Sequence, residues 1–264
     1  MLGLGSVSTK TSKHNRPRIC QLRKYMEFSD HDYYATASAS TDFKFGNGTN
    51  DADFSFFCWI RPSSFDDESI LFQSTAADSY SFYIKTDGKL VLNLAGSNRN
   101  NKILFRSANA LTVNKWTLVG FVNNPSGSGG TATDGSETQI YINGVSETLT
   151  VSNSNYDEQV NTDQTVAVSK NTWGFVGRYN QAIVIGQAVG PRAARNMYNG
   201  GVALNLYRYI GATNTIAAWT FGNHSSDTVA TIKNIKDTSR HSLDQSTSGN
   251  QAAIAGPADV RKDR

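Results

Sequence analysis

Cysteine, proline and charged residues are all scarce in this sequence. The 264 residues include 2 cysteines and 5 prolines, and 18% of them are charged. The two cysteines, Cys20 and Cys58, cannot build a disulfide framework, and neither belongs to a CxxC pair. This composition excludes a coiled coil, a collagen-like repeat and a highly charged disordered chain.

Long apolar segments are missing too. No apolar run approaches the roughly 18 residues that a transmembrane helix needs. The segment 1–12 is rich in Gly, Ser and Thr and contains no apolar core of a signal peptide. We therefore expect no membrane association and no export through a cleaved signal.

Short alternating runs separated by turn residues fill most of the chain. Asp87-Gly88 and Asn143-Gly144 each join two alternating runs, which indicates hairpins because such dipeptides tolerate positive φ. Only the segment 191–198 looks helical. Strands are predicted in the runs 53–62, 80–85, 90–94, 103–107, 116–123, 138–142, 145–151, 172–177, 183–186, 202–210 and 216–221.

This spacing of strands and turns is typical of an all-β protein with a two-sheet antiparallel sandwich. We expect the sandwich to occupy residues 25–221, followed by an irregular C-terminal extension, 222–264, that packs on the sandwich or on a neighbour. Cys58 is expected to be a small buried residue. The side chains expected in the core are Phe56, Trp59, Leu92, Trp116, Ile140, Ile142 and Trp219.

Charge is unevenly distributed along the chain. The formal net charge is +3, yet residues 1–24 hold six Lys and Arg and no acidic residue, which leaves −3 for the remainder. An extended basic N-terminal arm of this kind suits contact with phosphates or with the acidic surface of a protein; a solvated tail is the alternative. The arm residues expected to dock on a partner are Leu2, Leu4, Lys10, Lys13, Arg16, Arg18, Arg23 and Lys24.

Several segments of the chain, taken in order, resemble a known family. They are DFSFFCWIRP (53–62), DGKLVL (87–92), NKWTLVGF (114–121), QIYINGV (139–145), GFVGR (174–178) and GGVALNLYRYI (200–210). Their order and spacing are similar to those of laminin-G-like, concanavalin A-like jelly-roll domains. The resemblance implies a jelly-roll sandwich. Because the family includes lectins, glucanases and bacteriophage virion components, the fold alone does not give the function.

The sequence lacks the residue patterns of catalysis. A retaining glycanase needs two carboxylates about 5 Å apart, and the glucanases of the resembled family supply them from an E-x-D-x-(x)-E strand. The five Glu residues show no such spacing, and Asp66-Asp67-Glu68 is a contiguous turn. The four histidines lack the HxH and HExxH spacings of zinc sites. We therefore expect a protein that is not an enzyme, a glycoside hydrolase being the alternative.

Cofactor and glycan contacts are the remaining site hypotheses. No cofactor is expected; Asp30 and Asp32 flank His31 in SDHD, which is either a polar turn or a calcium loop. Glycan binding would use aromatic rings for stacking and polar groups for the sugar hydroxyls. The residues near predicted loops that could serve are Tyr156, Trp173, Tyr179, Asn180 and Tyr198, with core packing as the alternative for each.

Two functions from different classes fit these observations. The first is a non-catalytic structural protein of a bacteriophage virion, a capsid decoration, head-fibre or tail component attached through its arm and assembled in the host cytoplasm. The second is a lectin-like carbohydrate-binding module that mediates adhesion to a host surface. The expected partners are other virion proteins, further copies of the chain and surface glycans, and neither membrane nor nucleic acid.

Overall fold

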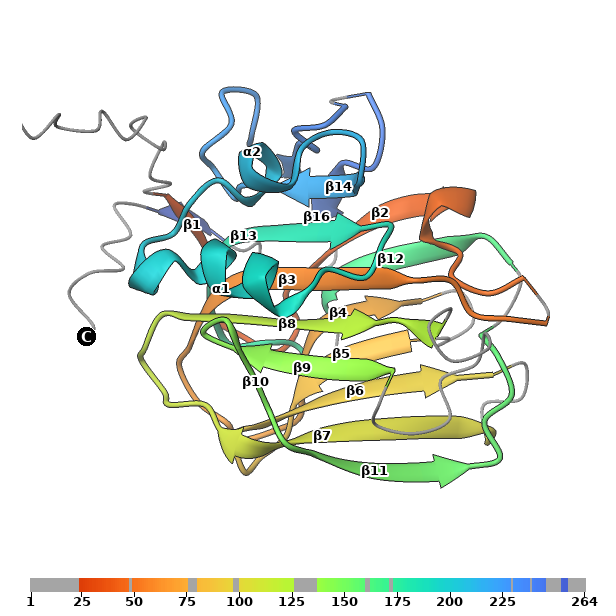
Figure 1. The fold of residues 1–264 in the computed structure, drawn as a ribbon. Helices are drawn as coiled ribbons and strands as arrows, with labels where there is room; N and C mark the ends of the chain where they lie inside the picture. The colour runs from red at the N-terminus through yellow and green to blue at the C-terminus, as the bar shows by residue number, and fades with distance from the viewer. Residues whose placement is uncertain are drawn as a thin grey trace, which may run out of the picture.

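Two antiparallel β-sheets pack face to face through their apolar inner surfaces (Figure 1). This computed structural model describes residues 24–47, 49–75, 80–96, 100–125, 137–159, 162–170, 173–228, 230–237, 239–245 and 253–255. The prediction of an all-β, two-sheet jelly-roll sandwich is confirmed. No helix among the described residues is long and apolar enough to cross a bilayer.

One sheet has eight strands. Its order is β10 (Val145–Ser146), β9 (Thr138–Ile142), β8 (Thr117–Asn123), β3 (Phe54–Pro62), β13 (Gly177–Ile185), β1 (Tyr25–Phe28) and β17 (Ala253–Ala255), and β14 (Thr215–Trp219) also pairs with β13. The strand β13 replaces the two short runs predicted at 172–177 and 183–186, because it pairs along its length with β3.

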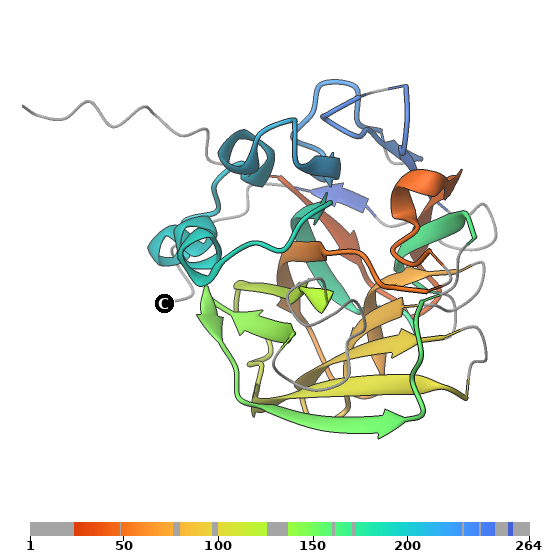
Figure 2. The same cartoon turned by 45° about the vertical axis from the view of Figure 1, so that its right-hand side comes forward.

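The other sheet has nine strands and forms the opposite layer (Figure 2). Its order is β11 (Leu149–Ser154), β7 (Lys102–Ala110), β6 (Lys89–Ala95), β5 (Tyr80–Ile84), β4 (Ser69–Ser74), β12 (Gln164–Ser169), β2 (Tyr34–Ser40), β16 (Leu243–Gln245) and β15 (Thr231–Ile232). The short 3-10 helix η1 (Thr41–Phe43) follows β2. The last two strands come from the segment expected to be irregular, so part of the C-terminal extension completes this sheet.

The core between the sheets is built by period-two alternation. Tyr80, Phe82 and Ile84 of β5 all point inward and are buried. Across the interface, the ring of Phe56 on β3 stacks on that of Phe72 on β4, with centroids 4.3 Å apart and planes at 6°. The expected core residues Phe56, Trp59, Cys58, Leu92, Trp116, Ile140 and Trp219 are buried, and Ile142 is only partly so.

Both predicted hairpins form, with different turns. Asn143 and Gly144 have φ values of +52° and +76°, as a two-residue turn between β9 and β10 requires. In the turn between β5 and β6, Gly88 has φ of +77° and Asp87 has no positive φ. The Gly88 N–H donates to the Lys85 carbonyl (2.8 Å), so this turn is one residue longer than a tight two-residue hairpin.

A helical segment covers the outer face of the eight-stranded sheet (Figure 1). It comprises α1 (Pro191–Tyr198), η3 (Asn199–Gly201) and α2 (Leu206–Ile210). The helix expected at 191–198 is confirmed. Beneath the segment lies a second apolar cluster that includes Phe57, Trp59, Tyr141, Ile183, Ile185, Met197 and Leu206. One of the two outer faces is therefore closed to solvent over these residues.

The prediction of a strand at 202–210 was wrong, because part of this stretch forms the helix α2. The Asn205 side chain accepts from the Arg208 N–H (3.1 Å) and caps α2, which ends at Gly211 with φ of +85°. No neighbouring strand pairs with this stretch in the described part of the chain. The side chain of Gln181 instead bonds the Leu204 carbonyl and the Leu206 N–H.

Most of the predicted arm lies outside the described residues, as do Cys20 and the segment 126–136. Of the arm residues, only Lys24 is described. Its carbonyl accepts from the side chains of Asn180 (2.7 Å) and Asn223 (3.0 Å), directly before β1 begins. The docking role of Leu2, Leu4, Lys10, Lys13, Arg16, Arg18 and Arg23 stays a prediction.

We predict that Phe72→Ala lowers the free energy of unfolding by roughly 3–5 kcal/mol, because it removes one ring of a buried stack between the sheets. Chemical denaturation followed by tryptophan fluorescence measures the change. Val145→Ala is the control, since Val145 is 61% exposed and surface changes usually stay within about 0.5 kcal/mol. Equal effects of the two substitutions would contradict the assigned packing.

Candidate functional site

The outer face of the nine-stranded sheet carries a polar patch over β4, β5 and β6, whereas the outer face of the eight-stranded sheet is apolar beneath its helical segment. Because Phe82 and Leu92 point inward, Ser81 and Asn93 point outward, and the pairing sets them directly opposite each other on β5 and β6. Gln73 of β4 lies opposite Ser81 on the other side. The three side chains form a polar row perpendicular to the strands.

A groove of about 330 Å³ lies over this row. We call it the β4–β6 groove. It is lined by Glu68, Ile70, Gln73, Ser74, Tyr80, Ser81, Tyr83, Asn93, Ala95, Lys102, Lys170 and Trp173. Its walls thus combine aromatic rings, amides, hydroxyls and ammonium groups, the mixture that recognises a polar ligand with apolar faces.

Trp173 is the exposed aromatic residue of the groove, with 47% of its surface accessible. Its carbonyl accepts from the Ile70 N–H (2.9 Å), which ties its backbone to β4. The Lys170 ammonium lies 5.1 Å from the centre of the indole ring. The backbone of Trp173 is therefore fixed beside β4, and its ring contacts the Lys170 ammonium.

Tyr83 and Glu68 form the polar end of the groove near Trp173. Burial and the negative charge of Glu68 raise the pKa of Tyr83 to about 12, so its phenol is protonated at neutral pH and can donate a hydrogen bond. The Glu68 carboxylate bonds the Lys85 ammonium (2.9 Å). Among the groove's lining residues Glu68 is the one carboxylate.

Asn93 contributes a polar atom that the protein leaves unbonded. Its Nδ2 lies 3.5 Å from Ser81 Oγ, a weak contact, and its buried Oδ1 has no hydrogen-bond partner among the described residues. A buried carbonyl oxygen without a donor is costly.

The sequence-predicted glycan residues do not gather at one place. Trp173 lines the β4–β6 groove. Tyr198 is half-buried, stacks on Trp59 at 5.9 Å, and lines a separate cavity of about 310 Å³ with Leu111 and Trp116. The other three residues are buried.

Their burial corrects the prediction for Tyr156, Tyr179 and Asn180. Tyr179 lies on the inner face of β13 and donates to the Leu71 carbonyl (2.9 Å). Tyr156 donates to Asp51 Oδ2 (2.6 Å). Each side chain is engaged inside the protein and cannot reach a glycan without leaving its place.

The SDHD turn was considered as a calcium loop. In the structure the His31 ring bonds the Gly174 carbonyl through Nδ1 (2.6 Å), while Asp32 is exposed. Within the described ranges, no three His, Cys, Asp or Glu side chains are placed to hold a metal ion. The His31 bond links the turn after β1 to the residues that precede β13.

A second cavity, of about 540 Å³, lies where the C-terminal segment meets β2. We call it the C-terminal cavity. It is lined by Ser38, Ala39, Ser40, Thr231, Lys233, Ser239, Arg240, His241, Ser242 and Asp244. No pattern in the sequence pointed to it, because its two walls are about 200 residues apart along the chain.

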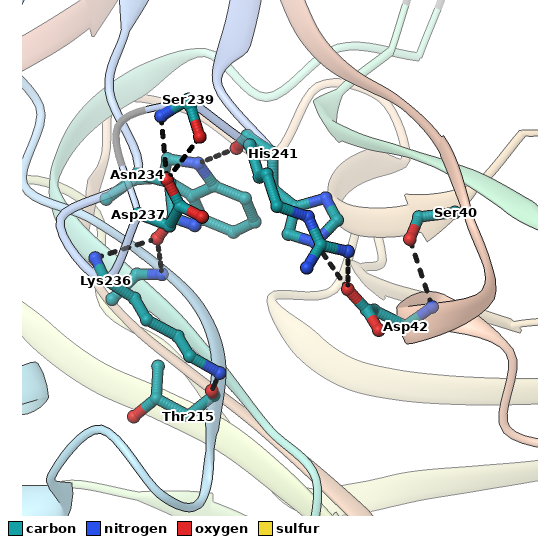
Figure 3. A network of polar contacts seen from close by, with 11 residues as sticks. Ser40, Asp42, Thr215, Asn234, Lys236, Asp237, Ser239 and His241 are labelled. Atoms are coloured by element: carbon teal, nitrogen blue, oxygen red, sulfur yellow. Dashed lines mark hydrogen bonds and ion pairs between the residues drawn. The ribbon is translucent and has the colours of Figure 1, made fainter.

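Asp42 fastens the wall of this cavity (Figure 3). Its Oδ2 bonds His241 Nε2 (2.8 Å) and Arg240 Nη2 (2.6 Å). The His241 ring also packs edge-on against Phe43, with centroids 4.8 Å apart. The Trp219 indole N–H donates to the His241 carbonyl (2.8 Å). These contacts hold the C-terminal segment on the sandwich.

The residues of the β4–β6 groove other than Trp173 were missed by sequence reasoning. Alternation could have found Ser81 and Tyr83, since Tyr80, Phe82 and Ile84 were already assigned to the opposite face. Gln73 lies on β4, which was not among the predicted strands. Lys102 reaches the groove through its pairing with Ala95, and no local pattern marks that contact.

A comparison with protein-family models matches residues 29–192, more than half of the chain, to the concanavalin A-like lectin/glucanases superfamily. No curated protein matches the sequence.

Among solved structures, the chain is similar to a Bacteroides ovatus protein provisionally assigned as carbohydrate binding. The identity is 16% and the TM-score 0.63, over 92% of this chain and 63% of that one. It therefore spans less than two thirds of that protein. It also resembles a CBM40 of a Ruminococcus gnavus sialidase bound to sialyllactose (9% identity, TM-score 0.46, 68% of this chain and 100% of that one). A heptameric pentraxin of Limulus polyphemus matches with 12% identity and a TM-score of 0.45, over 88% of this chain and 99% of that one. At 16% identity, the similarity to the Bacteroides ovatus protein shows a shared fold.

We predict that acid loosens the C-terminal segment through Asp42. Although partial burial opposes it, the bond from His241 and the charges of Arg240, His241 and Lys236 hold the pKa of Asp42 below its ordinary 3.8. Its stabilising contribution is therefore present above that ordinary value and is lost as the pH falls through the lowered one. Because 39% of the Asp42 side chain is exposed to solvent, the loss should stay under about 1 kcal/mol.

Amide-exchange protection factors of Ile232 and Leu243, taken relative to strand β3 at pH 7 and pH 3, measure this effect. Wild-type protection should fall at pH 3, whereas Asp42→Asn should already be low at pH 7 and change little. Identical pH responses of the two proteins would show that titration of Asp42 does not control the stability of the C-terminal segment.

Proposed function

Because the chain belongs to the concanavalin A-like lectin/glucanase superfamily, we propose that it is a carbohydrate-binding module that binds saccharides in the β4–β6 groove without cleaving them. The Bacteroides ovatus protein of the same fold, provisionally assigned as carbohydrate binding, is consistent with this class.

The exposed indole of Trp173 beside the Gln73–Ser81–Asn93 row carries the proposal. A sugar ring has an apolar face, which stacks on an aromatic side chain, and an edge of hydroxyls, which needs donors and acceptors. The groove offers both within one hollow. The backbone of Trp173 is tied to β4 by its bond to Ile70, which fixes where the indole side chain starts on the rim of the groove.

The difference between the two outer faces supports the same location. The helical segment covers Trp59, Ile183 and their neighbours on the eight-stranded sheet. On the outer face of the nine-stranded sheet, the β4–β6 groove is an open hollow with polar walls. A saccharide would meet solvent-accessible hydrogen-bonding groups there.

Binding without cleavage is supported by the carboxylates of the groove. Glycoside hydrolysis uses two carboxyl groups, about 5 Å apart in retaining enzymes and roughly 6.5–9.5 Å in inverting ones. Glu68 is the one carboxylate among the lining residues, and it is engaged by Lys85. The groove thus has groups for recognition and lacks a carboxylate pair in its lining.

Attachment to a bacteriophage virion through residues 1–24 stays a prediction. Most of that segment lies outside the described residues, and none of the comparisons tests virion assembly, oligomer formation or localisation. The proposed saccharide binding is compatible with it, because a surface protein of a particle can also contact glycans on a host.

We predict that Trp173→Ala weakens saccharide binding about tenfold or more, since an exposed aromatic anchor is a typical hot spot. A glycan array identifies the ligand, and isothermal titration then measures Kd. The matched control is Tyr209→Ala, which removes another aromatic ring that is 40% exposed but lies on α2. Equal binding by all three proteins would reject the groove as the site.

We also predict no turnover of any saccharide that binds. Prolonged incubation with the ligand should release no new reducing ends, because the groove lacks a second carboxylate in its lining. Reducing-end release that Glu68→Gln abolishes would show that the groove is catalytic. Release unaffected by this change would indicate a contaminating enzyme, which a repeat with independently purified protein would remove.

A further inference from the structure

The β4–β6 groove and the C-terminal cavity lie on one line across the same face of the nine-stranded sheet. Strand pairing places a continuous series of residues directly opposite one another: Asn93, Ser81, Gln73, Ala167, Thr36, Asp244 and Thr231. Directly opposed residues share a face. With neighbouring strands about 4.8 Å apart, the series spans roughly 29 Å.

We propose that the C-terminal segment builds a second saccharide subsite on this line, so that the ligand is an acidic polysaccharide chain lying from the β4–β6 groove to the C-terminal cavity. This inference rests on the proposed function, because it extends the same binding face. The residues of the C-terminal wall of this subsite lie outside residues 29–192, the part of the chain that matches the family model.

The side chain at the middle of the line is short and itself covered, since Ala167 is 1% exposed, so a continuous ligand would pass over the residues that cover it. Between the two cavities lies Ala167 of β12, the smallest side chain of the series. Its neighbours along β12, Val166 and Val168, point inward and are buried. No bulky side chain of the series itself therefore separates the groove from the C-terminal cavity.

The chemistry of the C-terminal cavity suits sugar hydroxyls. The hydroxyl groups of Ser38, Ser40, Thr231, Ser239 and Ser242 line it. Thr231 donates to Asp244 Oδ1 (2.9 Å), which leaves the second oxygen of that carboxylate to accept from a ligand. The Asp42 contacts hold Arg240 and His241, which line the same C-terminal wall as Thr231 and Asp244.

The charges along the line favour a ligand with carboxylate groups. Lys102 and Lys170 line the groove, and Lys233 lines the C-terminal cavity. Within the described part of the chain, none of the three ammonium groups has a carboxylate partner.

The other charges lining the two cavities are mostly compensated. Glu68 is paired with Lys85, and the Arg240 guanidinium with Asp42. His241 faces Asp42 as well, and Asp244 is the carboxylate without a cationic partner among the lining residues. Among the described residues, three ammonium groups without a carboxylate partner against one such carboxylate leave an excess of positive charge.

Titration calorimetry with galacturonate chains tests the proposal. The ligands are a galacturonate dimer, an oligogalacturonate long enough to span both cavities, and neutral galactan chains of the same two lengths. The proteins are the wild type, Lys233→Gln in the C-terminal cavity, Lys102→Gln in the groove, and Lys115→Gln as the control. Lys115 is exposed and lines the separate cavity beside Trp116, so its variant removes the same charge elsewhere.

We expect the long acidic chain to bind about tenfold or more tightly than the dimer and than the long neutral chain. Lys233→Gln should weaken long-chain binding about threefold to tenfold and leave the dimer unchanged, since charge-assisted hydrogen bonds are the strong ones. Lys102→Gln should weaken both acidic ligands, and Lys115→Gln neither. Rising salt should reduce the preference for the acidic chain.

Three results would overturn the inference: affinity that does not depend on chain length, equal effects of Lys233→Gln and Lys115→Gln, or a preference for the neutral chain. If a saccharide still bound in a manner that Trp173→Ala weakens, the proposed function would stand and the second subsite alone would fail. Absence of binding to every glycan on the array would reject both.

Discussion

The stack of Phe56 on Phe72 is the contact on which the rest of the structure depends. It joins the central strand of one sheet to the middle of the other, and it fixes which side of β4 faces the core. Because successive side chains of a strand alternate, the inward Phe72 forces Gln73 outward. Pairing then passes this orientation to Ser81 and Asn93, so the polar row of the groove follows from the packing of the core.

The two outer faces differ because only one of them has an apolar surface to bury. Phe57 and Trp59 point outward from β3, and the helical segment covers them. The outward row on β4, β5 and β6 is polar and needs no cover. The helices thus stabilise the sandwich from one side, and the polar β4–β6 groove lies on the other sheet, which the C-terminal strands β16 and β15 widen.

The sequence predicted the features that depend on local patterns. The alternation in 80–94 and the helix at 191–198 could both be read from neighbouring residues. Tyr179 and Asn180 were misplaced because the predicted runs ended at Gly177 and resumed at Ile183, whereas β3 pairs across that interval. Likewise β12 lies between the runs 145–151 and 172–177, where no strand was predicted. The line from Asn93 to Thr231 exists only through pairing between distant strands, which no local pattern reveals.

The indole N–H resonances provide the most direct test of saccharide binding on the open face. The four tryptophans give four probes: Trp59 and Trp219 are buried, Trp173 lies in the β4–β6 groove, and Trp116 lines the separate cavity beside Tyr198. In a ¹⁵N-edited spectrum titrated with a binding saccharide, the account predicts that the Trp173 resonance shifts most and that the other three change little. A shift confined to Trp116 would place the ligand on the other cavity and contradict the account.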